Sequence, residues 1–121
     1  MGTNYYFYVK ETISQKEAYT KLLENDEIDL LNEYIQNGFH VGKSSFGWRF
    51  VFHKQDRYEN LEELKEFYNK HSDVFELYDE YGRPMDFEKF LAFVEGKQTG
   101  QVGTHCELQE DGTAWLDCEF S

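Results

Sequence analysis

The sequence has few cysteines, one proline and no long apolar run. Two cysteines, Cys106 and Cys118, are too few for the disulfide framework of a small secreted protein. No stretch of 18 apolar residues occurs, so no transmembrane helix is expected. No basic segment followed by an apolar one comes after Met1, so no signal peptide is expected either. These absences predict a cytoplasmic protein without contact to a membrane.

Basic side chains are also scarce, because 12 Lys and Arg stand against 24 Asp and Glu, giving a formal charge of −12. This charge argues against direct nucleic-acid binding, which needs a basic surface, and it favours a basic protein partner. Aromatic residues, in contrast, are abundant at 18%. A disordered acidic chain lacks such residues. The 121 residues therefore predict a single folded domain, residues 1–121.

Hydrophobic periodicity and capping signals predict an α+β fold. Strands are expected at 3–10 and 74–79 and in two hairpins, over 39–54 and 105–120. Helices are expected at 14–24, 26–35, 60–70 and 86–95. The predicted architecture is a mostly antiparallel sheet with about four helices packed on it.

The register of the central hairpin determines where two histidines lie. A turn over KSSF, residues 43–46, pairs Val41 with Trp48 and directs Trp48 into the core. The same register places His40 and His53 on the opposite face, roughly 13 Å apart along the strands. A single metal ion does not span that distance.

The terminal hairpin is predicted to bring apolar residues onto one face. A three-residue loop with Gly112 in the left-handed conformation pairs Leu108 with Ala114 and Cys106 with Leu116. Both cysteines of the chain then point to the same side. Two alternatives remain open: the cysteines are small buried apolar residues, or they provide two ligands of a tetrahedral zinc site.

No catalytic constellation stands out, so the protein is not expected to be an enzyme. His105 and Cys106 are adjacent on a predicted strand, point to opposite faces and cannot form a base–nucleophile pair. The segment GKSS at 42–45 resembles part of a phosphate-binding loop. It has Asn37 where that motif has glycine, and it lies in a hairpin instead of before a helix.

Charge divides the chain into two unequal parts. Residues 40–57 carry a net charge of +3 and include the candidate anion-binding residues Lys43 and Arg49, whereas the remainder carries −15. The acidic residues concentrate on two predicted helices, as Glu24, Asp26, Glu27, Asp29 and Glu33, and as Glu59, Glu62, Glu63 and Glu66. They are either solvated helix faces or a surface that binds a basic protein.

Four segments carry a resemblance to small phage and prophage proteins: MGTNYY at 1–6, HVGKSSFGWRF at 40–50, DEYGRP at 79–84 and EFS at 119–121. Members of that family begin MGTNYY and carry H-I-G-K-S-S-x-G-W, and many have a C-x-x-C that looks like part of a zinc site. The corresponding segment here contains no cysteine. The resemblance therefore implies a structural zinc only if Cys106 and Cys118 join His40 and His53.

In size, charge and phage-like pattern the chain also resembles anti-CRISPR inhibitors of the RNA-guided nuclease Cas9. Cas9 holds nucleic acid in positively charged channels, which an acidic protein can occupy. The resemblance implies an inhibitor in the cytoplasm of the bacterial host, monomeric or weakly self-associating, that blocks nucleic-acid loading. The alternative is a zinc-dependent or nucleotide-handling phage enzyme that uses the hairpin at 40–57.

Overall fold

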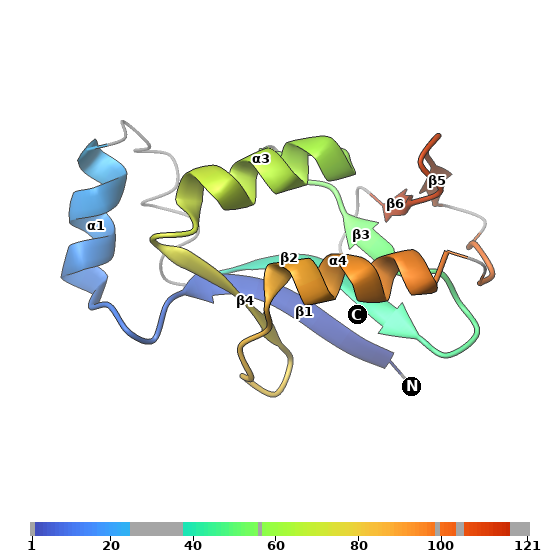
Figure 1. The fold of residues 1–121 in the computed structure, drawn as a ribbon, viewed down its shortest axis with the longest axis horizontal. Coiled ribbons are helices and arrows are strands. Elements are labelled where there is room, and N and C mark those ends of the chain that lie inside the picture. Colours follow the sequence, from blue (N-terminus) through green and yellow to red (C-terminus); the bar gives the residue numbers. More distant parts are fainter. Residues whose placement is uncertain (1, 25–37, 56, 99, 104–105, 117–121) are drawn as a thin grey trace.

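A computed structural model of the chain describes residues 2–24, 38–55, 57–98, 100–103 and 106–116. In chain order its elements are β1 (Gly2–Val9), α1 (Gln15–Glu24), β2 (Phe39–Ser45), β3 (Val51–His53), α3 (Leu61–His71), β4 (Phe75–Asp79), α4 (Phe87–Gly96), β5 (Glu107–Leu108) and β6 (Ala114–Leu116). This confirms the predicted α+β class (Figure 1). The predicted helix at 26–35, with Asp26, Glu27, Asp29 and Glu33, lies outside the described residues.

One six-stranded sheet, in the order β4-β1-β2-β3-β6-β5, forms the base of the fold. The pairs that involve β1, the β2–β3 pair and the β5–β6 pair are antiparallel, whereas β3 and β6 run parallel. The terminal hairpin thus continues the sheet beyond β3. None of the described helices is long and apolar enough to cross a membrane.

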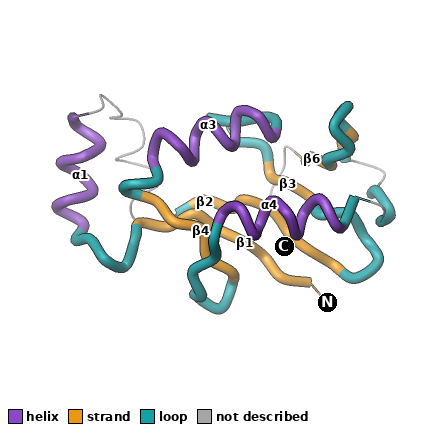
Figure 2. Tube along the Cα trace, viewed as in Figure 1, coloured by secondary structure: helices purple, strands orange, loops and turns teal. Residues whose placement is uncertain are grey.

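Helices α3 and α4 pack on the same face of the sheet, whereas α1 stands at one end of the molecule and the β5–β6 hairpin at the other (Figures 1 and 2). The ring of Phe7 lies 5.9 Å from that of Phe67 in α3 and 6.4 Å from that of Phe87 in α4. Phe50 contacts Phe90 of α4 edge-on. Burying each such side chain contributes about 1.5–3 kcal/mol, so the aromatic residues stabilise this layer strongly.

Side-chain caps begin all three described helices. Ser14 Oγ accepts a hydrogen bond from the backbone N–H of Glu17, and Asp86 Oδ2 accepts one from Lys89. Asn60 Oδ1 accepts one from Glu63, whose own carboxylate accepts the N–H of Glu59. These caps satisfy amides that have no partner within the helix, and they confirm the predicted helix starts.

The predicted register of the central hairpin is wrong. Gly42 pairs with Phe52 and Lys43 with Val51, so β2 runs to Ser45 and the chain turns after it. Gly42 is required inside the strand because a Cβ there would lie 2.4 Å from the Phe50 ring, while Gly47, with φ +81°, provides the turn. Trp48 is 43% exposed and bridges to Gln101 instead of entering the core.

The predicted register of the terminal hairpin is confirmed, but the predicted apolar face is not. Leu108 pairs with Ala114, and Gly112 adopts a φ of +87°. Leu108 is 53% exposed, whereas Trp115 on the alternate face is fully buried. The Trp115 indole stacks on Phe52 at 4.6 Å, and β5 lies at the sheet edge.

Candidate acidic binding groove

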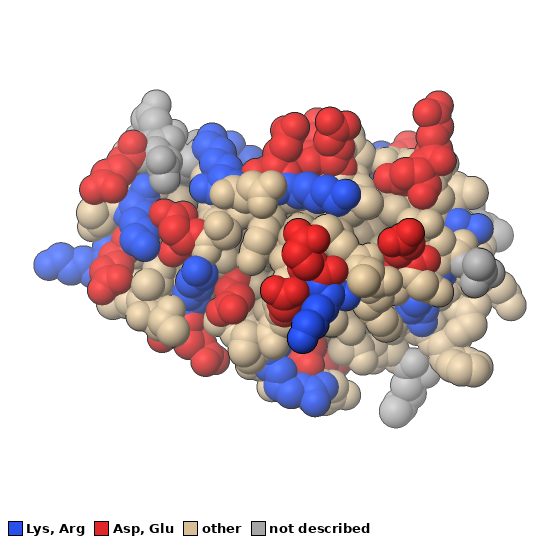
Figure 3. Space-filling view, in the orientation of Figure 1, with Lys and Arg blue, Asp and Glu red and all other residues tan. Residues whose placement is uncertain are grey.

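A cavity of about 530 Å³ separates the start of α3 from the β5–β6 hairpin. It is lined by four carboxylates and three other residues: Glu62, Glu107, Glu110, Asp111, Asn60, Leu108 and Gln109. We call these residues the acidic groove. Acidic side chains gather over α3 and over the hairpin at the upper right of Figure 3. The groove therefore joins two acidic segments that lie far apart in the sequence.

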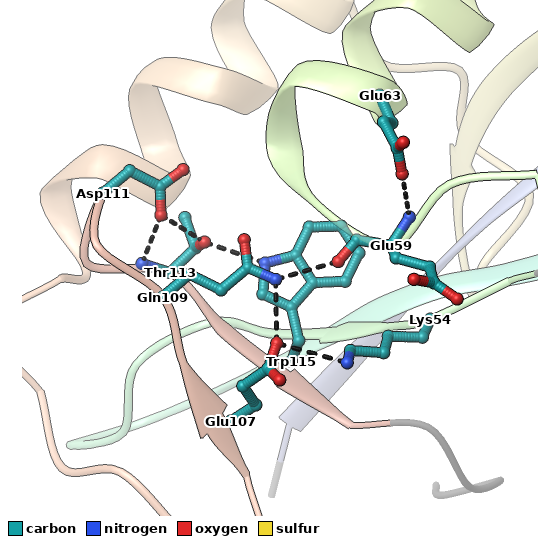
Figure 4. Close-up of polar contacts among 8 residues, drawn as sticks. All are labelled: Lys54, Glu59, Glu63, Glu107, Gln109, Asp111, Thr113 and Trp115. Atoms are coloured by element: carbon teal, nitrogen blue, oxygen red, sulfur yellow. Dashed lines mark hydrogen bonds and ion pairs between the residues drawn. The ribbon is translucent and has the colours of Figure 1, made fainter.

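Gln109 fastens the hairpin to the entry of α3. Its Nε2 donates to the carbonyl of Glu59 at 2.8 Å and to Glu107 Oε2 at 3.0 Å (Figure 4). The Gln109 backbone N–H also donates to the carbonyl of Thr113 and so closes the turn. One side chain thus sets the spacing between the two walls of the groove.

A chain of hydrogen bonds runs from the core into the groove. The buried Trp115 Nε1 donates to Thr113 Oγ1 at 2.8 Å, and Thr113 Oγ1 donates to Asp111 Oδ1 at 2.6 Å (Figure 4). The backbone N–H of Thr113 donates to the same carboxylate oxygen. The two donors of Thr113 therefore hold the Asp111 carboxylate in place, although Asp111 is exposed to solvent.

Glu107, one carboxylate of the groove, is stabilised in its charged form. The hydrogen bond from Gln109, followed by contact with the Lys54 ammonium, holds the pKa of Glu107 below its ordinary value. Lys54 Nζ lies 3.2 Å from Glu107 Oε2. The Lys54 ammonium thus partly neutralises the charge of Glu107, although Lys54 does not itself line the cavity.

The structure separates the acidic residues that the sequence singled out. Of those that lie in the described residues, Glu62 alone lines the groove. Glu63 and Glu66 line another cavity, of about 220 Å³, that basic side chains also line. Glu59 contributes backbone groups to the wall. Glu24 ends α1, at the opposite end of the molecule from the hairpin (Figure 1).

Sequence reasoning missed Glu107, Glu110 and Asp111, which line the candidate groove. Their signal was an acidic run around the Gly112 turn. That run lies about 45 residues from the acidic helix start in a chain rich in carboxylates, and only the sheet order brings them together.

The two hairpin histidines lie next to each other, in contrast to the predicted separation. Their ring centroids are 5.5 Å apart on the sheet face opposite the helices, because the true register brings their positions together. His40 Nε2 lies 2.9 Å from Asn4 Oδ1, and Gln55 Nε2 donates to His53 Nδ1 at 3.2 Å. A metal at either nitrogen would have to displace an amide.

The zinc site stays a prediction. Within the described part of the chain, no group of three His, Cys, Asp or Glu side chains is placed to hold a metal ion. Cys106 lines a different cavity, together with Lys43 and Arg49, and Cys118 lies outside the described residues. Zinc analysis of the purified protein tests this prediction, and a metal-free protein contradicts it.

Arg49, one of the two candidate anion-binding residues, is engaged in the fold. Its Nε donates to the carbonyl of Gly100 at 3.1 Å and its Nη1 to the carbonyl of Gly112 at 2.8 Å. The guanidinium thus joins the central hairpin to the loop after α4 and to the terminal turn. Lys43, the other candidate, lines the same cavity as Arg49 and Cys106.

Comparison of the chain with protein-family models, curated proteins and solved structures finds no match.

Proposed function

We propose that the protein is a non-enzymatic inhibitor that binds a basic surface of another protein through its acidic groove. The observation that carries this proposal is the meeting of four carboxylates from two elements around one cavity. Their positions are fixed by Gln109 and by the Trp115–Thr113–Asp111 chain. A preorganised charged surface loses less entropy on binding than a mobile one.

The groove has the chemistry to accept a lysine or arginine side chain. Leu108, which is 53% exposed, offers an apolar surface for the methylene groups of such a side chain. The surrounding carboxylates accept charge-assisted hydrogen bonds from its cationic end. Association with a basic surface is accelerated by charge attraction and weakened by salt.

For the partner we propose Cas9, following the resemblance to anti-CRISPR proteins in size, charge and phage-like pattern. Cas9 carries positively charged channels for guide RNA and target DNA. An acidic protein bound in or beside such a channel competes with nucleic acid and blocks loading. The proposed inhibitor therefore binds the nuclease alone more tightly than the nuclease that already holds its guide.

A pull-down tests this proposal. Tagged protein is incubated with Cas9, with and without guide RNA, at about 0.1 M and about 1 M NaCl, where the Debye length falls from roughly 10 to 3 Å. We expect retention of guide-free Cas9 at low salt and loss at high salt. Absence of retention in every condition contradicts the proposed partner.

A further inference from the structure

A second cavity, of about 200 Å³, lies beside the central hairpin and differs in character from the acidic groove. Apolar side chains and the stems of two cations line it, chiefly Lys43, Trp48, Arg49, Val51, Cys106 and Leu116. The proposed function does not use this cavity. Its lining combines an apolar interior with positive charge on a protein of net charge −12.

The cavity is built by close backbone packing. The loop after α4 lies against the central hairpin, where Arg49 N–H donates to the carbonyl of Gln101 at 2.8 Å and Gln101 N–H donates to that of Gly47. Gly100 permits this approach, because a Cβ there would lie 2.5 Å from the carbonyl carbon of Trp48. The wall that carries Trp48 is therefore held in place without a ligand.

Among the residues that the structure describes, no carboxylate pairs with the cations that line this cavity. In the described ranges, neither Lys43 nor Arg49 forms an ion pair with an acidic side chain. Arg49 contacts only backbone carbonyls through its Nε and Nη1. Lys97 does not line the cavity, but its Nζ donates to the carbonyl of Ser45, which is a lining residue. An anionic group at this position would supply the missing negative charge.

We infer that this cavity binds a small aromatic carboxylate. Apolar cavities of about 150 Å³ hold one benzene molecule, so the volume here suits a single ring with a short acidic substituent. The ring packs against Val51, Leu116 and the half-exposed indole of Trp48, and the carboxylate lies at the Lys43 ammonium. This inference is independent of the acidic groove and of the proposed partner.

The two tryptophans make the test specific. Phenylacetate is titrated into the labelled protein while the indole N–H signals of Trp48 and Trp115 are followed by NMR. Trp48 lines the cavity, whereas Trp115 is fully buried and donates to Thr113. We expect a saturable shift of the Trp48 signal alone. A Trp48 signal that stays in place, or a shift of both signals together, overturns the inference.

Charge recognition is tested with a neutral ligand and a matched pair of variants. Phenylacetamide has the same shape without the charge, so we expect it to bind more weakly. Lys43→Gln should weaken phenylacetate binding by about fivefold, as expected for loss of one charge-assisted contact. Lys89→Gln, on the exposed side of α4, should leave it unchanged. Equal binding of acid and amide, or equal affinity of the two variants, contradicts the role of Lys43.

Discussion

At the scale of single residues, the hydroxyl of Thr113 connects the core to the acidic groove. It accepts the indole N–H of Trp115 and donates to Asp111, and Thr113 itself is 2% exposed. Removing this hydroxyl leaves the buried indole N–H of Trp115 without a partner. It also removes one of the two donors that hold the Asp111 carboxylate, while the backbone N–H of Thr113 remains.

We therefore predict that Thr113→Val destabilises the fold by about 1–3 kcal/mol, the usual result of leaving a buried polar group unsatisfied. Urea unfolding monitored by tryptophan fluorescence measures the change. Thr20→Val on the exposed side of α1 removes a hydroxyl of the same kind and should change stability by less than about 0.5 kcal/mol. Equal effects of the two substitutions would show that the Thr113 hydroxyl has no special role.

Asp79, the last residue of β4, has a side chain whose ionisation stabilises the turn that follows the strand. Burial opposes ionisation there, but hydrogen bonds from the backbone N–H and the Nε of Arg83 and from the N–H of Tyr81 outweigh it and lower the pKa of Asp79. A lowered pKa stabilises the folded state above the unfolded value of about 3.9, and this stabilisation is lost as the pH falls through the folded pKa.

Asp79→Asn should accordingly cost about 1 kcal/mol at pH 6, and its difference from the wild type should shrink below about pH 4. Chemical unfolding across this pH range measures the difference. Asp73→Asn, at an exposed position, is the control and should track the wild type throughout. A gap that stays constant down to low pH is inconsistent with this assignment.

At the scale of elements, two glycines near the end of α4 differ in whether a side chain would fit in their place. A Cβ at Gly100 would lie 2.5 Å from the Trp48 backbone, whereas a Cβ at Gly96 meets nothing within 4 Å. We predict that Gly100→Ala separates the loop from the hairpin and lowers stability by about 1–3 kcal/mol. Gly96→Ala, at the last position of the helix, should be neutral or stabilise by up to about 1 kcal/mol.

Thermal unfolding of both alanine variants tests this contrast. Hydrogen exchange of the Arg49 amide, which donates to Gln101, adds a local measurement that should accelerate only in Gly100→Ala. If both variants behave alike, close packing of the loop on the hairpin is not what fixes its position.

The elements also differ in how far the sequence alone predicted them. Helix starts are local, and the capping side chains at Ser14, Asn60 and Asp86 predicted them directly. The central hairpin was predicted wrongly because its register depends on the Phe50 ring over Gly42, a contact that spacing does not encode. The parallel pairing of β6 with β3 was also not predictable, since it depends on the stacking of Trp115 on Phe52.

The candidate site was predictable only in part for a related reason. The helix-start carboxylate Glu62 belongs to a charge cluster that the sequence displays openly. Its opposite wall, Glu107, Glu110 and Asp111, depends on where the terminal hairpin joins the sheet. The count of charges therefore predicted an acidic surface, but only the three-dimensional structure showed which carboxylates lie together in the groove.

At the scale of the whole molecule, negative charge is abundant, but the two cavities differ in the sign of the charged residues that line them. One is lined by four carboxylates and the other by Lys43 and Arg49 without a paired acid among the described residues. In the function proposed above, net charge accelerates association with the basic partner, and the groove determines where that partner docks. The two contributions can be separated by changing the same amount of charge at different places.

The most direct test is a titration of guide-free Cas9 with two double variants. Glu62→Lys with Glu110→Lys reverses charge in the groove, and Glu88→Lys with Glu95→Lys makes the same net change on exposed positions of α4. We expect the groove variant to bind at least about tenfold more weakly than the α4 variant, because like charges then face each other at the proposed interface. Equal affinities of the two variants would contradict the groove as the binding surface.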